Sequence, residues 1–143
     1  MPTIRNAEVP GVIEGLGQIA KCKLPVAGKL RVVKVTRALQ AHWQDVLEVR
    51  DGLVRECCVL GEDGEPVREE HPDGTVSFPW RDEAARVEFN RRWGELLAES
   101  FTHPWGIEPA HVAPVDPAHD EVTAEMLLAL GDFFIEPEED GDG

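Results

Sequence analysis

Cysteine is scarce in this sequence, and the few residues present are poorly placed for a disulfide framework. The three cysteines, Cys22, Cys57 and Cys58, are an odd number. The adjacent pair falls within a predicted helix, where neighbouring side chains point about 100° apart. We therefore expect reduced thiols that serve as small apolar side chains. A metal-binding or redox role is the alternative that the sequence leaves open.

Long apolar runs are also missing. No stretch approaches the ~20 apolar residues that a membrane-spanning helix needs. Residues Met1 to Arg5 lack the charged-then-apolar order of a signal peptide. The sequence therefore predicts a cytoplasmic protein with no membrane partner.

Amide side chains are few, with two Asn and three Gln beside eleven Pro, and Arg outnumbers Lys by ten to four. Scarce amides and abundant proline are typical of proteins that must withstand heat. A GC-rich genome produces some of the same bias. A thermophilic source is therefore one expectation from the composition.

Positive charge is absent from the last third of the chain. Residues 1 to 60 carry a net charge of +3 and residues 61 to 143 a net charge of −17. No Lys or Arg follows Arg92, whereas thirteen acidic residues do. Such a segment repels phosphates and favours basic protein surfaces. Direct nucleic-acid binding by residues 61 to 143 is therefore not expected.

One stretch, Pro25 to Leu60, has the apolar spacing of a single long helix, although Gly52 could bend it. The rest of the fold is predicted to pack around it. The seam positions are Val32, Val35, Leu39, His42, Val46, Val49, Leu53, Glu56 and Leu60. Trp43, Leu47, Val54 and Cys57 lie beside the seam and widen the apolar stripe that we expect to pack against other elements.

The remaining segments predict an α+β fold that is mainly α, with antiparallel helical partners for the long helix. The first partner begins at Asn6 as a helix cap and folds back through the Cys22–Pro25 turn. The other expected elements are a small hairpin cap across residues 67–78, a helix over 82–101 capped by Asp82, a proline-rich crossing over 102–121, and a short helix from Thr123 to Leu130. A single domain over 1–135 and a disordered acidic tail over 136–143 complete the prediction.

No combination of residues indicates catalysis. His103, His111 and His119 recur near Asp116, Asp120 and Glu121, which is a conceivable zinc cluster, but prolines interrupt the segment. No serine or cysteine has a nucleophile setting, and no glycine loop has the phosphate-binding pattern. We predict a protein that is not an enzyme and needs no metal or cofactor.

Two groups of residues are candidates for binding a partner. The first is a basic corner with no acidic residue between Gly15 and Gln44, formed by Lys21, Lys23, Lys29, Arg31, Lys34 and Arg37; a solvated helical face is its alternative. The second is aromatic and aliphatic, next to the acidic tail; its alternative is closure of the core. The candidates are Lys21, Lys23, Lys29, Arg31, Trp105, Phe133, Phe134 and Ile135.

The order of these features resembles a family of small tailed-phage proteins. The resemblance covers about residues 6 to 135. The segments that carry it are the Asn6-led helix, the Leu24-Pro25 turn, the long helix running into Gly61–Val67, the segment Ala85–Asn90, and Glu95–Phe101.

With the heat-adapted composition, the sequence is also similar to a thermophilic-phage protein that binds the host's RNA polymerase. That similarity implies a monomeric transcription regulator in the host cell. It would contact the β-subunit flap and region 4 of σ, inhibit initiation at −10/−35 promoters and redirect promoter choice. The same family resemblance also permits a virion or tail-assembly component.

Overall fold

The computed structural model describes residues 1–115, 118 and 120–135 of the chain. They form two compact units. The first unit combines residues 1–43 with the chain from Ser100 onward, and the second unit is Gln44–Glu99. The predicted single domain over 1–135 thus contains two compact parts, and the predicted disordered tail lies outside the described residues.

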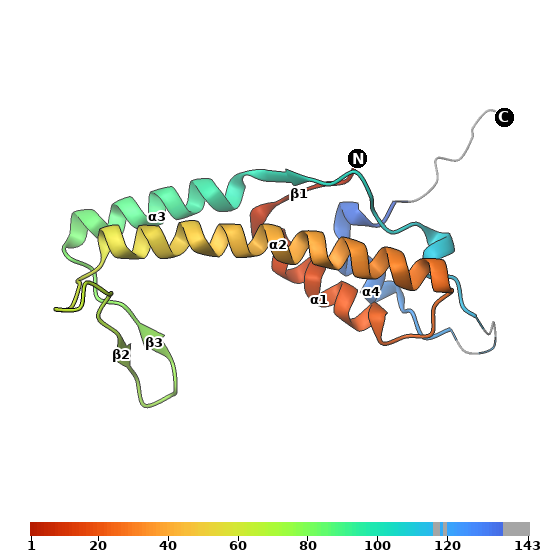
Figure 1. Cartoon of the computed structure of the whole chain (residues 1–143), viewed down its shortest axis with the longest axis horizontal. Coiled ribbons are helices and arrows are strands. Elements are labelled where there is room, and N and C mark those ends of the chain that lie inside the picture. The colour runs from red at the N-terminus through yellow and green to blue at the C-terminus, as the bar shows by residue number, and fades with distance from the viewer. Residues whose placement is uncertain (116–117, 119, 136–143) are drawn as a thin grey trace. The chain divides into compact units, whose positions relative to one another are not determined.

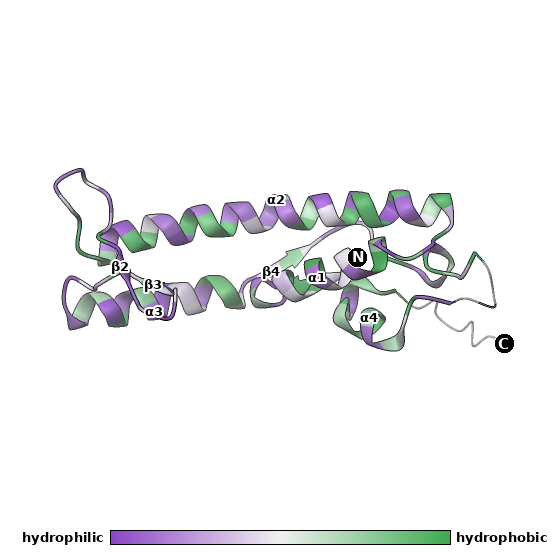
Figure 2. Ribbon diagram, turned by 90° about the horizontal axis from the view of Figure 1, so that it is seen from below, coloured by the Kyte–Doolittle hydropathy of each residue, from purple (hydrophilic) through white to green (hydrophobic). Residues whose placement is uncertain are grey.

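The predicted long helix is present as α2, Val26–Cys57, and belongs to both units. Hydrophobic and hydrophilic residues alternate along it with helical spacing (Figure 2). Its first half packs against α1, Val9–Ala20, and its second half against α3, Glu83–Ala98. The mainly helical α+β prediction, with helical partners for the long helix, is therefore confirmed.

The buried face of α2 departs from the predicted seam beyond Val46. Val49 is 51% exposed and Leu60, which lies beyond the end of α2, is 46% exposed, whereas Val54 and Cys57, predicted to lie beside the seam, are buried with Leu53. The seam followed a seven-residue repeat, which corresponds to 3.5 residues per turn. A straight helix turns every 3.6 residues, so the buried positions drift forward along the chain.

The first unit buries one hydrophobic core. Two short strands, β1 (Thr3–Arg5) and β4 (Ser100–Thr102), pair antiparallel at its edge (Figure 1). The α4 helix, Ala124–Ala129, and the 3₁₀ turns η1 (Asn6–Glu8), η2 (Pro109–His111) and η3 (Gly131–Phe133) complete the unit. The core consists of Ile4, Val9, Val12, Leu16, Ile19, Cys22, Leu24, Val32, Val35, Leu39, Ile107, Val112, Leu130 and Phe133.

Two local predictions, one for each unit, are wrong. Asn6 does not cap α1; it is buried in η1, and its Oδ1 lies 2.6 Å from Nε2 of His42. The predicted 82–101 helix ends at Ala98, because Ser100–Thr102 pairs with β1 instead. Both errors arise from contacts between segments far apart in the sequence.

The second unit packs α3 and a hairpin against the end of α2. The hairpin strands are β2, Glu69–Glu70, and β3, Val76–Ser77, with Gly74 at φ +87 in the turn, as its sequence predicted. Asp82 caps α3 by accepting the Ala85 N–H at 2.7 Å. The buried core is Leu53, Val54, Cys57, Cys58, Ala85 and Phe89.

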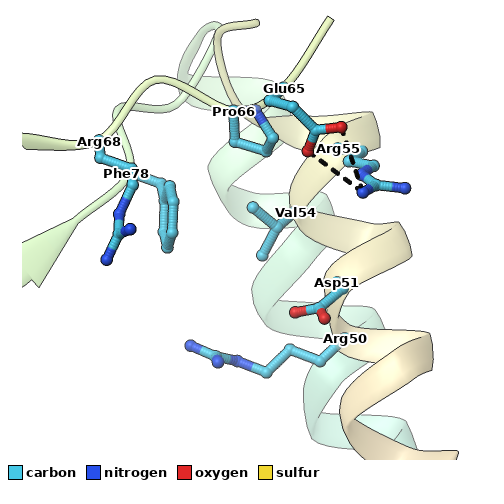
Figure 3. A pocket seen from close by; sticks show the side chains of 8 residues that line it. All are labelled: Arg50, Asp51, Val54, Arg55, Glu65, Pro66, Arg68 and Phe78. Carbon is cyan, nitrogen blue, oxygen red and sulfur yellow. Dashed lines mark hydrogen bonds and ion pairs between the residues drawn. The ribbon is translucent and has the colours of Figure 1, made fainter.

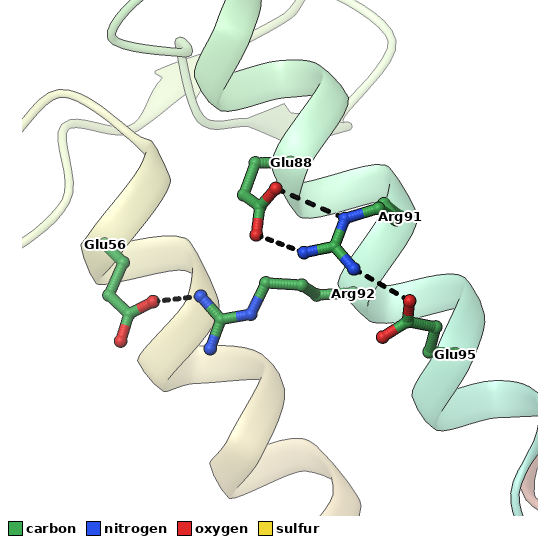
Figure 4. Close-up of polar contacts among 5 residues, drawn as sticks. All are labelled: Glu56, Glu88, Arg91, Arg92 and Glu95. Atoms are coloured by element: carbon green, nitrogen blue, oxygen red, sulfur yellow. Dashed lines mark hydrogen bonds and ion pairs between the residues drawn. The ribbon is translucent and has the colours of Figure 1, made fainter.

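In the second unit, one ion pair joins α3 to α2 and others lie within α3. Arg92 of α3 reaches Glu56 of α2, while Arg91 pairs with Glu88 and Glu95 of its own helix (Figure 4). Exposed pairs of this kind contribute little to stability. The helices are therefore held together mainly by the apolar core beneath them.

The three cysteines are buried and free, as expected of small apolar side chains. Burial is the main reason that the pKa of Cys58 is raised. Among the described residues, no helix combines the length and the low polarity required to cross a bilayer.

The close contact of η2 with α2 predicts that adding a side chain at Gly28 destabilises the protein. A Cβ at Gly28 would lie 1.8 Å from the carbonyl oxygen of His111. Gly28→Ala should therefore lower the free energy of unfolding by about 1–3 kcal/mol, because backbone must move to make room. Urea unfolding followed by circular dichroism measures the change.

Gly17→Ala in α1 is the matched control, since a Cβ there has no atom within 4 Å. Alanine favours the helix by up to about 1 kcal/mol over glycine, so this variant should be slightly more stable than the wild type. Equal effects of the two substitutions would contradict the close approach of η2 to α2.

Candidate functional site

An open hollow of about 550 Å³ lies on the surface of the first unit. It is lined by Ala124, Leu127 and Leu128 of α4, by Gly131, and by Phe134. All of these residues except glycine present apolar side chains. The volume is in the range of sites that take a small ligand or a few side chains of a partner.

Local sequence signals build the helix that carries this hollow. Thr123 caps α4 by accepting the N–H of Met126 at 3.2 Å, as predicted. Gly131 adopts φ +55, a conformation that L side chains rarely adopt, and the chain turns there into η3. A six-residue helix is too short to be stable alone, so α4 depends on its packing.

The packing of α4 decides which of its leucines face outward. A Cβ at Gly15 of α1 would lie 2.9 Å from Cβ of Ala129, which shows how closely the two helices approach. Leu130 is completely buried behind this contact, whereas Leu128 is 79% exposed. Leu128 is therefore the most prominent apolar side chain of the hollow.

The surroundings of the hollow are acidic. A neighbouring hollow of about 220 Å³ shares Leu128 and Gly131 with the first and adds Glu8 and Asp132 to its lining. Glu125 is exposed in the first turn of α4. Of the described residues that line these two hollows, none is Lys or Arg. An apolar floor with an acidic rim suits an apolar anchor on a basic partner.

The structure separates the three apolar residues at the start of the tail. Phe133 is completely buried, so it fills the core, which is the alternative that the sequence left open. Phe134 is partly buried and lines the 550 Å³ hollow. Ile135 lines a further hollow with Asp132 and Phe134. Two of the three therefore line hollows on the surface of the first unit.

Of the basic candidates, Arg31 contacts the aromatic candidate Trp105. The guanidinium of Arg31 lies 5.6 Å from the centre of the Trp105 ring and donates to the carbonyl of Gly106 at 3.2 Å. Lys34, a further residue of the basic corner, places its Nζ 5.5 Å from the same ring. Both distances allow cation–π attraction.

The other three lysines remain apart from this contact. Lys21, Lys23 and Lys29 are exposed around the connection between α1 and α2, and the backbone N–H of Lys23 donates to Glu121 at 2.7 Å. Lys34 lies three residues beyond Arg31, a spacing that brings the two side chains to the same face of α2. The sequence gives only a weak indication that Leu128 is exposed. Met126–Leu130 is entirely apolar, and a helix on the surface cannot bury every side.

His111 sits where η2 meets α2. Its Nδ1 accepts the N–H of Glu108 at 2.9 Å, which requires an unprotonated nitrogen. Burial and the nearby Arg31 lower the pKa of His111 below its ordinary value near 6.5, and they outweigh the opposing effect of Glu108. His111 is therefore neutral at pH 7.

The histidines do not assemble into a metal centre in the part of the chain that the structure describes. No three His, Cys, Asp or Glu side chains come together there as potential ligands. His103 instead accepts the N–H of Trp105 at 3.1 Å. His119 and Asp116 of the conceivable zinc cluster lie outside the described residues.

Comparison with protein-family models, with curated proteins and with solved structures finds no match to this chain.

The lowered pKa of His111 predicts a pH-dependent stability. Because the folded protein binds this proton less readily than the unfolded chain, the stabilising contribution is present above the ordinary pKa and is lost as the pH falls through it. The melting temperature should fall more between pH 7.5 and 5.5 in the wild type than in His111→Gln. Superimposable pH profiles of the two proteins would contradict this prediction.

Proposed function

We propose that this protein is a phage-encoded regulator that binds the RNA polymerase of its bacterial host and acts without catalysis. Its partners are the flap of the β subunit and region 4 of σ. Binding inhibits initiation at −10/−35 promoters and shifts the enzyme toward other promoters. The protein works in the host cytoplasm as a monomer.

The observation that carries the proposal is the acidic-rimmed apolar hollow on α4. Leu128 and Phe134 offer apolar contact area there, Asp132 lines the adjoining smaller hollow, and Glu125 is exposed in the first turn of α4. An amphipathic helix with basic flanks is the natural occupant of such a surface. Helical, basic elements are what a σ domain and a flap are expected to offer.

Long-range charge supports the same class of partner. The net charge of −17 over residues 61–143 speeds encounter with basic protein surfaces and disfavours direct contact with promoter DNA. The similarity to a thermophilic-phage protein that binds RNA polymerase supplies the specific partner, and the charge and the hollow are compatible with it.

The mechanism requires only a difference in binding free energy. A protein that binds the displaced arrangement of σ region 4 more tightly than the normal one shifts the population toward the displaced arrangement. A shift from 1:99 to 99:1 needs about 5.5 kcal/mol of differential affinity. A few well-buried apolar anchors are enough to supply that amount.

The test is a pull-down of purified bacterial RNA polymerase with the tagged protein, using holoenzyme and core enzyme at low and high salt. Leu128→Asp should weaken retention of holoenzyme by about thirtyfold, the effect of losing an anchor worth about 2 kcal/mol. Retention should also fall with salt, because the charge attraction is screened.

Val87→Asp is the control for this variant. Val87 is also an exposed aliphatic side chain, at 53%, but it lies on α3 in the second unit. The Val87→Asp variant should retain holoenzyme as the wild type does. Failure of the wild-type protein to retain holoenzyme at low salt would overturn the proposal and would favour a role in virion or tail assembly.

A further inference from the structure

The second unit contains a separate hollow that combines apolar walls with arginines. Its volume is about 250 Å³, and it lies between the last turns of α2 and the chain around Glu65 to Arg68 (Figure 3). The residues lining it are Arg50, Asp51, Val54, Arg55, Glu65, Pro66, Arg68 and Phe78. All of them belong to the second unit.

The arginines of this hollow are not equivalent. Arg55 pairs with Glu65, with Nη2 and Oε2 3.2 Å apart, so these two charges offset each other. Among residues 44–99, all of which the structure describes, no ion pair involves Arg50 or Arg68. This is notable because the unit has fifteen acidic residues and only seven arginines.

The unpaired arginines lie beside the apolar part of the hollow. Figure 3 shows the guanidinium groups of Arg50 and Arg68 on the same side as the Phe78 ring, away from the Arg55–Glu65 pair. The Arg50 guanidinium also lies 5.7 Å from the centre of the Trp93 ring. This contact restricts the side chain before any ligand arrives.

We propose that this hollow binds a carboxylate carried on a short apolar stem. The planar guanidinium groups of Arg50 and Arg68 match a carboxylate in shape and charge. Val54, Pro66 and Phe78 provide the apolar contact for the stem. The proposal is independent of the polymerase assignment, because no residue is shared with the α4 hollow.

The charge of the wall selects the type of anion. With Arg55 and Glu65 offsetting each other, Arg50, Asp51 and Arg68 leave a net charge of +1. A single negative charge is balanced by this wall, whereas a phosphate dianion would meet uncompensated repulsion from Asp51. Such a carboxylate occurs on a free aromatic or aliphatic acid and at the C-terminus of a polypeptide.

The experiment titrates the full-length, ¹⁵N-labelled protein with phenylacetate and follows amide chemical shifts. We expect saturable shifts confined to residues around the hollow. Phenylacetamide, the neutral analogue, should cause none, because it lacks the charge that the arginines recognise. A tetrapeptide ending in phenylalanine, with a free or an amidated C-terminus, distinguishes a polypeptide source from a free acid.

Matched variants locate the binding. Arg50→Gln/Arg68→Gln should weaken phenylacetate binding at least tenfold, since charge-assisted hydrogen bonds are lost. Arg81→Gln removes the same charge per site from an arginine that lies outside the hollow and takes no part in an ion pair within residues 44–99. It should bind as the wild type does.

Arg68→Gln alone guards against misfolding of the double variant, because Arg68 is exposed. It should weaken binding while the melting temperature stays that of the wild type. Saturable shifts with neither phenylacetate nor the free-carboxylate peptide would overturn the proposal. Equal weakening by Arg81→Gln and Arg68→Gln would also overturn it, since it would show attraction to net charge only.

Discussion

Burial of the α2 helix along most of its length is the constraint on which the rest of this structure depends. In the first unit, Val32, Val35 and Leu39 of α2 are buried in a core with residues of α1. In the second unit, Leu53, Val54 and Cys57 are buried with residues of α3. Hydrophobic burial is the largest favourable term in folding, and most helices in proteins are stable only because one face is covered. Each half of α2 therefore needs its own unit.

The same constraint explains why both proposed sites lie where they do. The short α4 helix is stabilised by the burial of its neighbours Leu130 and Phe133, which leaves Leu128 outside the core. The hollow with Arg50 and Arg68 forms where the buried side of α2, at Val54, meets the chain that returns after the helix. In both places an apolar floor continues from the core to the surface. Ligand and partner sites commonly have this character.

The two sites differ in charge and so in the partners that they suit. Glu8 and Asp132 border the hollows on α4, whereas Arg50 and Arg68 border the hollow of the second unit. The first arrangement favours a basic protein surface and the second a small carboxylate. A protein with a strong overall negative charge can thus present one local site of the opposite sign. Net charge alone would have concealed that site.

The sequence by itself determined the helices, the caps of α3 and α4, and the hairpin. The apolar spacing predicted α2 and α3, and Asp82 and Thr123 predicted the starts of α3 and α4. The Pro72-Asp73-Gly74 turn predicted the β2–β3 hairpin. These features depend on residues within a few positions of one another, so a linear pattern contains them.

Only the tertiary structure decided the use of Asn6, the pairing of β1 with β4, and the partners of Arg31 and Leu128. Asn6 contacts His42, Thr3 lies opposite Thr102, and Arg31 contacts Trp105. Each contact joins residues at least 36 positions apart, and three-residue strands have no periodicity to detect. Whether Leu128 or Leu130 is buried depends on the approach of α4 to α1 at Gly15. Where all residues of a short helix are apolar, the sequence does not indicate which face is buried. The surface against which the helix packs decides this.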